Sequence, residues 1–188
     1  MEQQSARKTY QYKLKPTAEQ ELALDRTLML CRHVYNAAVG ERREAWRLCG
    51  VSVTYYQQKA ELPGVKEAMP EYGEVHSQVL QDVVLRVDRA LQGFFRRWRE
   101  CQTPGYPRFH GRDRYNSFTY PQYGGGAMLD GGVLNLSKIG RIRLHRPLQD
   151  TPQTVTISRE ADGWHAYISC AEVPTQPLAL TGQGTAST

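Results

Sequence analysis

Alternation of hydrophobic and polar residues begins near the N-terminus, in the segment KTYQYKLK at residues 8–15. Tyr10, Tyr12 and Leu14 share one face there, and the opposite face is polar and basic. This period of two predicts a half-buried β-strand. Because one strand is not stable by itself, we expect it to pair with strands from the C-terminal part of the chain.

Helical periodicity follows directly after Pro16. The residues Thr17-Ala-Glu-Gln20 have the form of a capping box, in which the threonine caps the helix and the glutamine reaches back to the cap's amide. Apolar residues then recur at steps of three and four, which predicts an amphipathic helix to about Leu48. We expect a short second helix from Thr54 to Leu62, ended by Pro63-Gly64.

A third and longer helix is predicted from about Val75. Its apolar positions form one stripe, made of Leu80, Val84, Val87, Leu91, Phe94 and Trp98. Apolar residues at helical spacing usually belong to a core. We therefore expect Phe94, Phe95 and Trp98 to pack the helices against one another.

The spacing of hydrophobic residues changes after Gly105 from the helical period to one typical of short strands. Short strands are predicted at residues 117–120, 127–130, 133–137 and 141–145, with a hairpin turn at Asp130-Gly131-Gly132. A longer hairpin pairs residues 154–160 with 164–173. Its inward face holds Val155, Ile157, Trp164, Ala166, Ile168 and Cys170.

One strand, about ninety residues of helix and five or six further strands predict an α+β fold. We expect a small antiparallel β-barrel interrupted by a helical insertion. The predicted parts are a first barrel strand at 1–16, a helical lobe at 17–104 and the second part of the barrel at 105–174. A flexible linker or tail is expected at 175–188, which has neither period nor charge.

Positive charge is concentrated in one segment of the chain. The whole sequence carries a net charge of +5, and residues 86–114 alone hold eight Arg, no Lys and three acidic residues. Arginine binds phosphate in a bidentate way and stacks on flat rings, so this segment favours nucleic acid as a partner. A solvated helix face is the alternative interpretation of such a run.

Aromatic rings alternate with these arginines. Arg108, Arg112 and Arg114 are interleaved with rings of Tyr106, Phe109, Tyr115, Phe118 and Tyr120. This pattern is typical of surfaces that hold phosphates and stack on bases. On the third helix, Ser77 and Gln81 share a face and have side chains that can read base edges.

Catalytic patterns are absent from the sequence. The four cysteines form no close pair, the five histidines lie far apart, and no nucleophile has a base partner at a known spacing. We expect reduced, mostly buried thiols in a cytosolic protein. The N-terminus MEQQSARK has no apolar stretch and no window of about 18 apolar residues occurs, so neither a signal peptide nor a membrane span is expected.

Five blocks of the sequence carry a resemblance to a known family. They are Lys13-Leu-Lys-Pro-Thr-Ala-Glu-Gln20, Cys31-Arg-His-Val-Tyr-Asn36, Ser77-Gln-Val-Leu-Gln81, Gly105-Tyr-Pro-Arg-Phe109 and Ser117-Phe-Thr-Tyr-Pro-Gln122. In this order, over residues 8–174, the chain resembles the N-terminal half of the TnpB/OrfB family. Its members are transposon-encoded RNA-guided DNA endonucleases, similar to the ancestors of type V CRISPR effectors.

The resemblance implies a wedge-like barrel and a recognition lobe that hold a guide RNA from the transposon end. They would also read a short motif beside the target in double-stranded DNA, the remaining sequence being read by base pairing. Expected DNA-motif contacts are Tyr55, Ser77, Gln81, Thr119 and Tyr120. Expected contacts to RNA or DNA backbone are Lys13, Lys15, Arg32, Arg96, Arg97, Arg108, Arg112, Arg114 and Tyr115. Arg32 and Asn36 have a second interpretation, as residues that support helix packing.

The resemblance also has a limit. The family continues into an RNase-H-like domain with a catalytic Asp, a later Glu and Asp, and a four-Cys zinc ribbon, none of which has a counterpart here. We therefore expect no DNA cleavage by this chain alone and no cofactor in it, since magnesium and zinc would belong to that nuclease domain. A separate nuclease chain is a candidate partner. The expected location is the cytoplasm of a prokaryote, in association with the nucleoid.

Two alternatives remain open on the sequence. The helices around residues 17–48 could form a guide-independent regulator of helix-turn-helix type, which a palindromic site and dimerisation would favour. The chain could also be a transposon remnant whose nucleic-acid surface is vestigial, because a fold does not guarantee a function.

Overall fold

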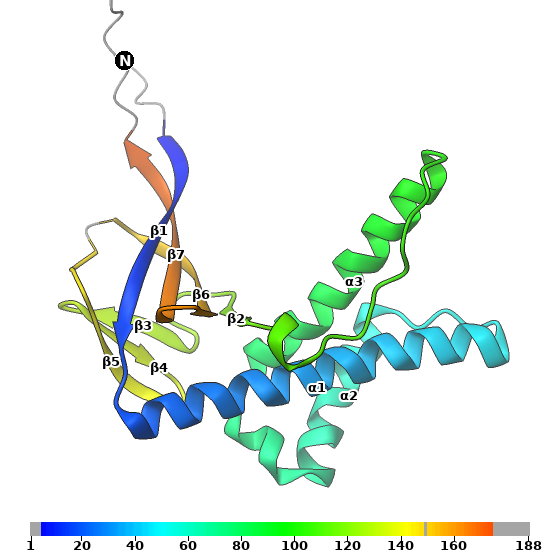
Figure 1. Ribbon diagram of the computed structural model, residues 1–188, viewed down its shortest axis with the longest axis horizontal. Helices are drawn as coiled ribbons and strands as arrows, with labels where there is room; N and C mark the ends of the chain where they lie inside the picture. Colours follow the sequence, from blue (N-terminus) through cyan, green and yellow to red (C-terminus); the bar gives the residue numbers. More distant parts are fainter. Residues whose placement is uncertain (1–4, 149, 175–188) are drawn as a thin grey trace, which may run out of the picture.

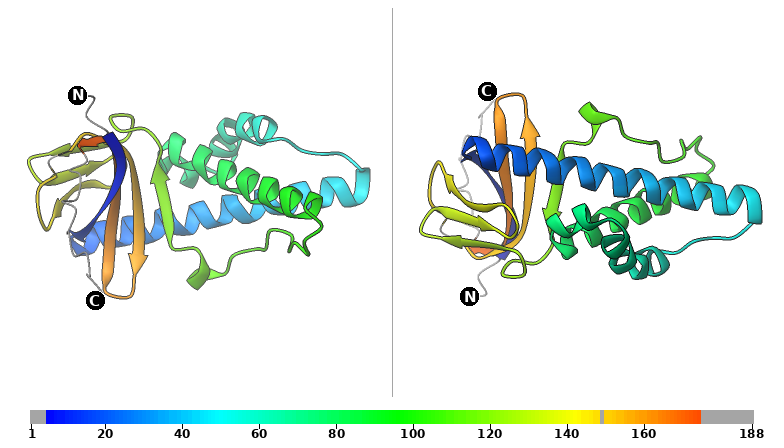
Figure 2. Two further views of the ribbon diagram at one scale, coloured as in Figure 1. Left: turned by 90° about the horizontal axis from the view of Figure 1, so that it is seen from above. Right: turned by 90° about the horizontal axis from the view of Figure 1, so that it is seen from below.

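The computed structural model describes residues 5–148 and 150–174. Within these ranges one β-strand comes first, three α-helices follow, and six strands come last. The barrel lies at one end of the molecule and the helices project from it (Figures 1 and 2). This order confirms the predicted α+β architecture, while the predicted tail at 175–188 lies outside the described residues.

Seven strands form one antiparallel sheet, in the order β2-β6-β7-β1-β5-β4-β3, which curls into a nearly closed barrel. Strand β1 (Ser5–Lys15) is central, with Thr9 opposite Ser169 of β7 and Leu14 opposite Leu144 of β5. The N-terminal strand therefore pairs with C-terminal strands as predicted. The other strands are β2 (Ser117–Tyr120), β3 (Ala127–Asp130), β4 (Val133–Leu136), β5 (Gly140–Leu144), β6 (Pro152–Glu160) and β7 (Gly163–Pro174).

Alternate residues of these strands fill the barrel. The predicted inward face of the β6–β7 hairpin is confirmed, since Val155, Ile157, Trp164 and Ile168 are all buried. The turn between β3 and β4 requires glycine because Gly131 and Gly132 have φ angles of 51° and 87°, in the left-handed region.

Helix α1 (Ala18–Cys49) runs from the barrel along the length of the helical part (Figure 2). Thr17 caps it through a complete capping box with Gln20, and Gly50 ends it in the left-handed conformation. The predicted start and length of this helix are confirmed.

The predicted end of the second helix is wrong. Helix α2 (Tyr55–Ala68) begins at the Thr54 cap but continues through Pro63. Pro63 is exposed, so the carbonyl that loses its helical partner can bond to water. Leu62 is buried before it and the Lys66 ammonium donates to the Val75 carbonyl (2.9 Å) after it, and these contacts hold both halves of the helix in place.

Helix α3 (Ser77–Arg99) follows the short 3-10 helix η1 (Pro70–Glu74). Its stripe is buried as predicted from Leu80 to Leu91. The predicted packing is wrong for the last turns, because Phe95 and Trp98 are 51% and 66% exposed. The helix projects beyond the elements that cover its first half (Figure 1), so the end of the stripe is covered only in part: Phe94 packs against Tyr106, and Trp98 is exposed.

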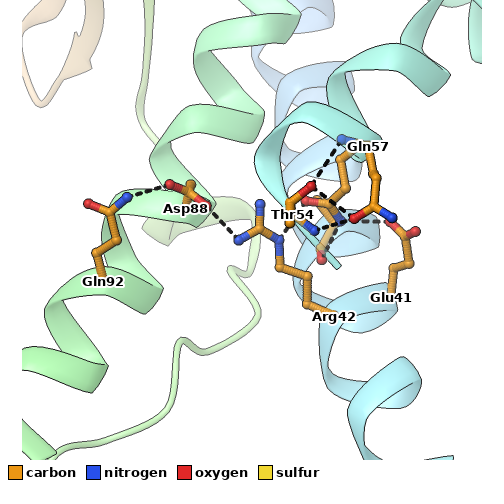
Figure 3. A network of polar contacts seen from close by, with 8 residues as sticks. Glu41, Arg42, Thr54, Gln57, Asp88 and Gln92 are labelled. Carbon is orange, nitrogen blue, oxygen red and sulfur yellow. Dashed lines mark hydrogen bonds and ion pairs between the residues drawn. The ribbon is translucent and has the colours of Figure 1, made fainter. Parts of the chain in front are cut away.

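A buried arginine joins the three helices (Figure 3). Arg42 of α1 donates from Nε to Gln58 Oε1 of α2 (2.8 Å) and from Nη1 to Asp88 Oδ1 of α3 (2.8 Å). Gln58 Nε2 donates in turn to the Ala38 carbonyl (3.0 Å). Hydrogen bonds of this kind are worth most where water is excluded, so this network fixes how the helices sit together.

Residues 100–116 run from the end of α3 back along α1 to the barrel, and include the 3-10 helix η2 (Arg112–Arg114). Asn36 fixes this return segment, because its side chain donates to the His110 carbonyl (3.0 Å) and accepts from the His110 amide (2.8 Å). The Arg43 guanidinium also lies 4.8 Å from the centre of the Phe109 ring. Asn36 thus has the packing role considered for it.

Two of the four thiols are buried, those of Cys31 and Cys170, while Cys49 and Cys101 are exposed. Burial raises the pKa of the Cys31 thiol to about 12. All four are free, as expected, although only half of them are buried. Among the described residues no helix is long and apolar enough to cross a membrane.

Candidate nucleic-acid interface

A cleft of about 1090 Å³ opens where α1, η2 and the turn of the β6–β7 hairpin meet. Leu28, Met29 and Tyr115 contribute apolar surface to it. Four arginines also line it, namely Arg26, Arg32, Arg112 and Arg159, together with the acidic residues Asp25, Asp113 and Glu160. Its walls come from three segments that are separate in the sequence, at residues 22–32, 112–116 and 159–161.

These four arginines differ in their partners. Arg26 forms an ion pair with Glu74, and Arg159 Nη1 lies 2.8 Å from Asp25 Oδ1. Within the described ranges, no carboxylate lies within 4.0 Å of Arg32 or Arg112. The structure thus brings two predicted backbone contacts, Arg32 and Arg112, to one cleft without ion-pair partners, which favours an anionic ligand.

Most arginines of the arginine-rich segment, residues 86–114, also lack an ion-pair partner in the described structure. Of its eight arginines only Arg86 has an ion-pair partner among the residues that the structure describes. Arg108, Arg112 and Arg114 are exposed on the return segment. Arg96 is exposed and Arg97 half-buried at the end of α3. These five guanidinium groups are therefore available to phosphates.

Lys13 and Lys15 of β1, both predicted backbone contacts, differ in their partners. Lys15 is exposed without an ion pair in the described part of the chain, whereas Lys13 Nζ lies 2.9 Å from Asp162 Oδ2. This carboxylate competes with phosphate for Lys13. The Lys13 ammonium also lowers the pKa of the Asp162 carboxyl, chiefly through their hydrogen bond.

Ser77 and Gln81 lie together at the N-terminal end of α3, as their spacing predicts. Ser77 is exposed and Gln81 half-exposed. The Ser77 hydroxyl accepts a hydrogen bond from Lys66 Nζ (2.9 Å). Burial and the charge of Lys138 lower the pKa of Lys66. Lys66 and Lys138 are cationic neighbours of this site that the sequence did not indicate, because only the fold brings them to Ser77.

Three other predicted contacts need correction or reassignment. Tyr115 and Tyr120 are buried, because strand alternation and the return segment turn their rings inward, and burial raises the pKa of both. The Tyr120 hydroxyl donates to the Ser137 carbonyl (3.1 Å). The Thr119 hydroxyl accepts a hydrogen bond from Arg86 Nη2 (2.6 Å) and shares another with the Thr156 hydroxyl (2.8 Å). The side chains of Tyr115 and Tyr120 therefore support the surface from within.

Tyr55 lies apart from the other predicted motif contacts. It opens α2 beside the Thr54 cap, at the level of the Arg42 network, and its ring packs edge-on to Tyr56. Asp88 of that network is eleven residues along α3 from Ser77. At 1.5 Å per residue this separation is about 16 Å. Any DNA that contacts both Tyr55 and Ser77 must span several base pairs.

A triple-glycine loop packs against the first turn of α3. A Cβ atom at Gly125 would lie 2.7 Å from Gln78 Oε1, and one at Gly126 would lie 2.8 Å from His76 Cε1. These distances are too short for a Cβ contact, so a side chain at either position would force the Gln78 amide or the His76 ring to move. Burial, followed by the charges of Lys66 and Lys138, lowers the pKa of His76. No sequence pattern considered above predicts this contact, although the run Gly124-Gly125-Gly126 is a visible signal for it.

Comparison with known proteins gives two matches. Residues 1–49 match the model of a helix-turn-helix domain family of OrfB and IS605 elements. The chain is 32% identical over 187 residues to a Streptomyces pristinaespiralis protein named "Putative RNA-guided DNA endonuclease". The alignment covers 95% of this chain and 45% of that protein, so the chain spans less than half of its relative's length.

The described part of the matched N-terminal region does not form a helix-turn-helix motif. Its described part consists of β1 and the single uninterrupted helix α1. A helix-turn-helix motif needs a second helix at a steep angle after a short turn, and residues 5–49 hold only one. The family match therefore supports nucleic-acid binding more than it supports insertion of a recognition helix from this region.

Proposed function

We propose, on the premise that this chain belongs to the TnpB/OrfB family, that it is a nucleic-acid-binding half that holds a guide RNA and contacts a short motif in target DNA. The observation that carries the proposal is the set of unpaired arginines on α1, the end of α3 and the return segment. Seven of the eight arginines in residues 86–114 have no carboxylate partner in the described structure, so their charge is available to a polyanion.

The site at the start of α3 supports a role in motif contact. Ser77 and Gln81 offer a hydroxyl and an amide at the surface, and Lys66 places a cation beside them. Side chains of these types read base edges and phosphates. We assign the motif contact to Ser77 and Gln81, and we assign to Thr119, which bonds to Arg86 and Thr156, a role in joining α3 to the barrel.

We also propose that DNA cleavage requires residues beyond those described. In residues 5–148 and 150–174, no three His, Cys, Asp or Glu side chains lie close enough to hold a metal ion. Metal-assisted hydrolysis of a phosphodiester needs such a ligand set. The role of this chain in the reaction would then be to bind and orient the nucleic acids.

A salt titration of RNA binding tests the proposal. We expect the double variant Arg32→Gln/Arg112→Gln to bind single-stranded RNA more weakly, with the slope of log K against log salt reduced by about 0.7 for each lost phosphate contact. Arg141→Gln is the matched control, because Arg141 is exposed but paired with Asp130 at 3.3 Å. Equal losses in both variants would contradict the assignment of the cleft.

Sequencing of co-purified RNA tests the guide itself. The chain is purified from a host that carries the neighbouring locus, and the bound RNA is sequenced. One discrete RNA from the adjoining element supports guide binding by this half. A heterogeneous mixture, or no RNA, contradicts it and leaves duplex DNA binding as the remaining function.

A further inference from the structure

The last two turns of α3 expose large aromatic side chains. Phe95 and Trp98 are 51% and 66% exposed. Phe94, one turn before Trp98 in the same stripe, is covered by Tyr106 of the return segment, with ring centres 5.5 Å apart. The chain then reverses at Cys101, whose φ is 56°, and leaves Trp98 uncovered. This end of the helix therefore carries flat apolar surface that the fold does not use.

Cationic groups surround these rings. Arg96, Arg97 and Arg99 occupy the same two turns, and none has a carboxylate within 4.0 Å in the part of the chain that the structure describes. Arg99 Nε donates to the Phe95 carbonyl, at 3.3 Å. The nearby Glu100 carboxylate accepts from Gln102, at 3.1 Å. The surface thus combines rings with uncompensated positive charge.

The end of α1 provides an internal comparison. Trp46 is exposed to the same extent as Trp98, at 66%. Its neighbouring arginines are compensated, since Glu44 pairs with Arg47 at 2.5 Å and with Arg43 at 3.6 Å. Exposure of a tryptophan is therefore common to both helix ends, and only α3 adds free cations to it.

We infer that Phe95, Trp98 and the three arginines of the α3 end form a stacking platform for unpaired nucleotides of single-stranded RNA. The inference rests on the proposed function and adds a site to it. An aromatic face stacks on any base, and adjacent guanidinium groups hold the flanking phosphates. A second copy of this chain fits the surface poorly, because it would bring like charges together.

The test separates base stacking from charge attraction. A labelled single-stranded oligoadenylate and an abasic oligonucleotide of equal length are titrated against the full chain. We expect the wild type to bind the base-bearing RNA about tenfold more tightly, which is the effect of one stacked base. Trp98→Leu should lose this preference, and the matched variant Trp46→Leu should keep it.

Each outcome has a meaning. Equal preference in Trp98→Leu and Trp46→Leu overturns the platform, while salt-dependent binding of both RNAs would leave the proposed function intact. No binding of either RNA by the wild type overturns both proposals. Phe95→Ser is a second variant, expected to weaken the preference in the same way. Thermal melting confirms that the variants are folded, as expected for exposed positions.

Discussion

The two halves of α3 use the same residue type in opposite ways. In the N-terminal half, Arg86 pairs with Asp82 (2.9 Å) and donates to the Ser117 carbonyl (2.8 Å) and the Thr119 hydroxyl (2.6 Å). At the C-terminal end, three arginines have no carboxylate partner among the described residues. The Arg86 contacts tie the helix to the barrel, and the C-terminal end projects from the molecule (Figure 1).

This difference separates structural from binding arginines. All of them contribute equally to the net charge of residues 86–114, so composition alone assigns them one role. A guanidinium group whose donors are satisfied within the fold adds stability and little affinity for phosphate. An unpaired one adds affinity and little stability. Variants in the two halves should therefore change different measurements.

The largest effect on stability is expected at Arg86. Arg86→Ala leaves the Asp82 carboxylate buried, since its side chain is only 7% exposed and Arg86 is its ion-pair partner. Loss of one member of a buried pair costs about 3 kcal/mol. For a chain of this size the melting temperature should fall by roughly 6–12 °C, as differential scanning calorimetry would measure.

Arg89→Ala is the control for that variant. Arg89 is exposed one turn further along α3 and has no ion pair within the described residues. We expect a change within about 0.5 kcal/mol, as for most surface substitutions. If both variants unfolded at the same temperature, the contrast between bonded and unpaired arginines would be wrong.

A smaller effect is expected where the triple-glycine loop meets α3. Gly126→Ala would place a methyl group 2.8 Å from the His76 ring. Overpacking of this kind costs about 1–3 kcal/mol, to be measured by chemical denaturation. Gly105→Ala is the matched control, because a Cβ there would meet no atom within 4 Å. A wild-type stability for Gly126→Ala would show that the loop is not held against the helix.

Features that depend on neighbouring residues were predictable from the sequence. The capping box of Thr17 and Gln20 formed as predicted, since its partners are three residues apart. The inward face of the β6–β7 hairpin was also predictable, because period two decides which side chains share a face. The central place of β1 followed from the instability of an isolated strand.

Features that depend on residues distant in the sequence were not predictable from it. The stripe of α3 identifies one face but not where its neighbours stop, so Phe95 and Trp98 were assigned to the core. Pro63 signals a helix end, yet contacts of Leu62 and Lys66 elsewhere in the fold carry α2 past it. Within the site, the engagement of Thr119 by Arg86 joins residues 33 positions apart, which leaves no local signal.

The smallest effect is expected from pH at the barrel end of α3. The pKa of His76 is lowered in the folded protein, chiefly by burial, so the unfolded chain binds a proton more readily. This contribution to stability is present above the ordinary histidine pKa of about 6.5 and is lost as pH falls below it. We expect the melting temperature to fall less between pH 7 and pH 5 in His76→Gln than in His33→Gln, whose histidine is exposed. Identical pH profiles would mean that protonation of His76 is accommodated in the fold, and that the contact between the glycine loop and α3 is looser than its packing indicates.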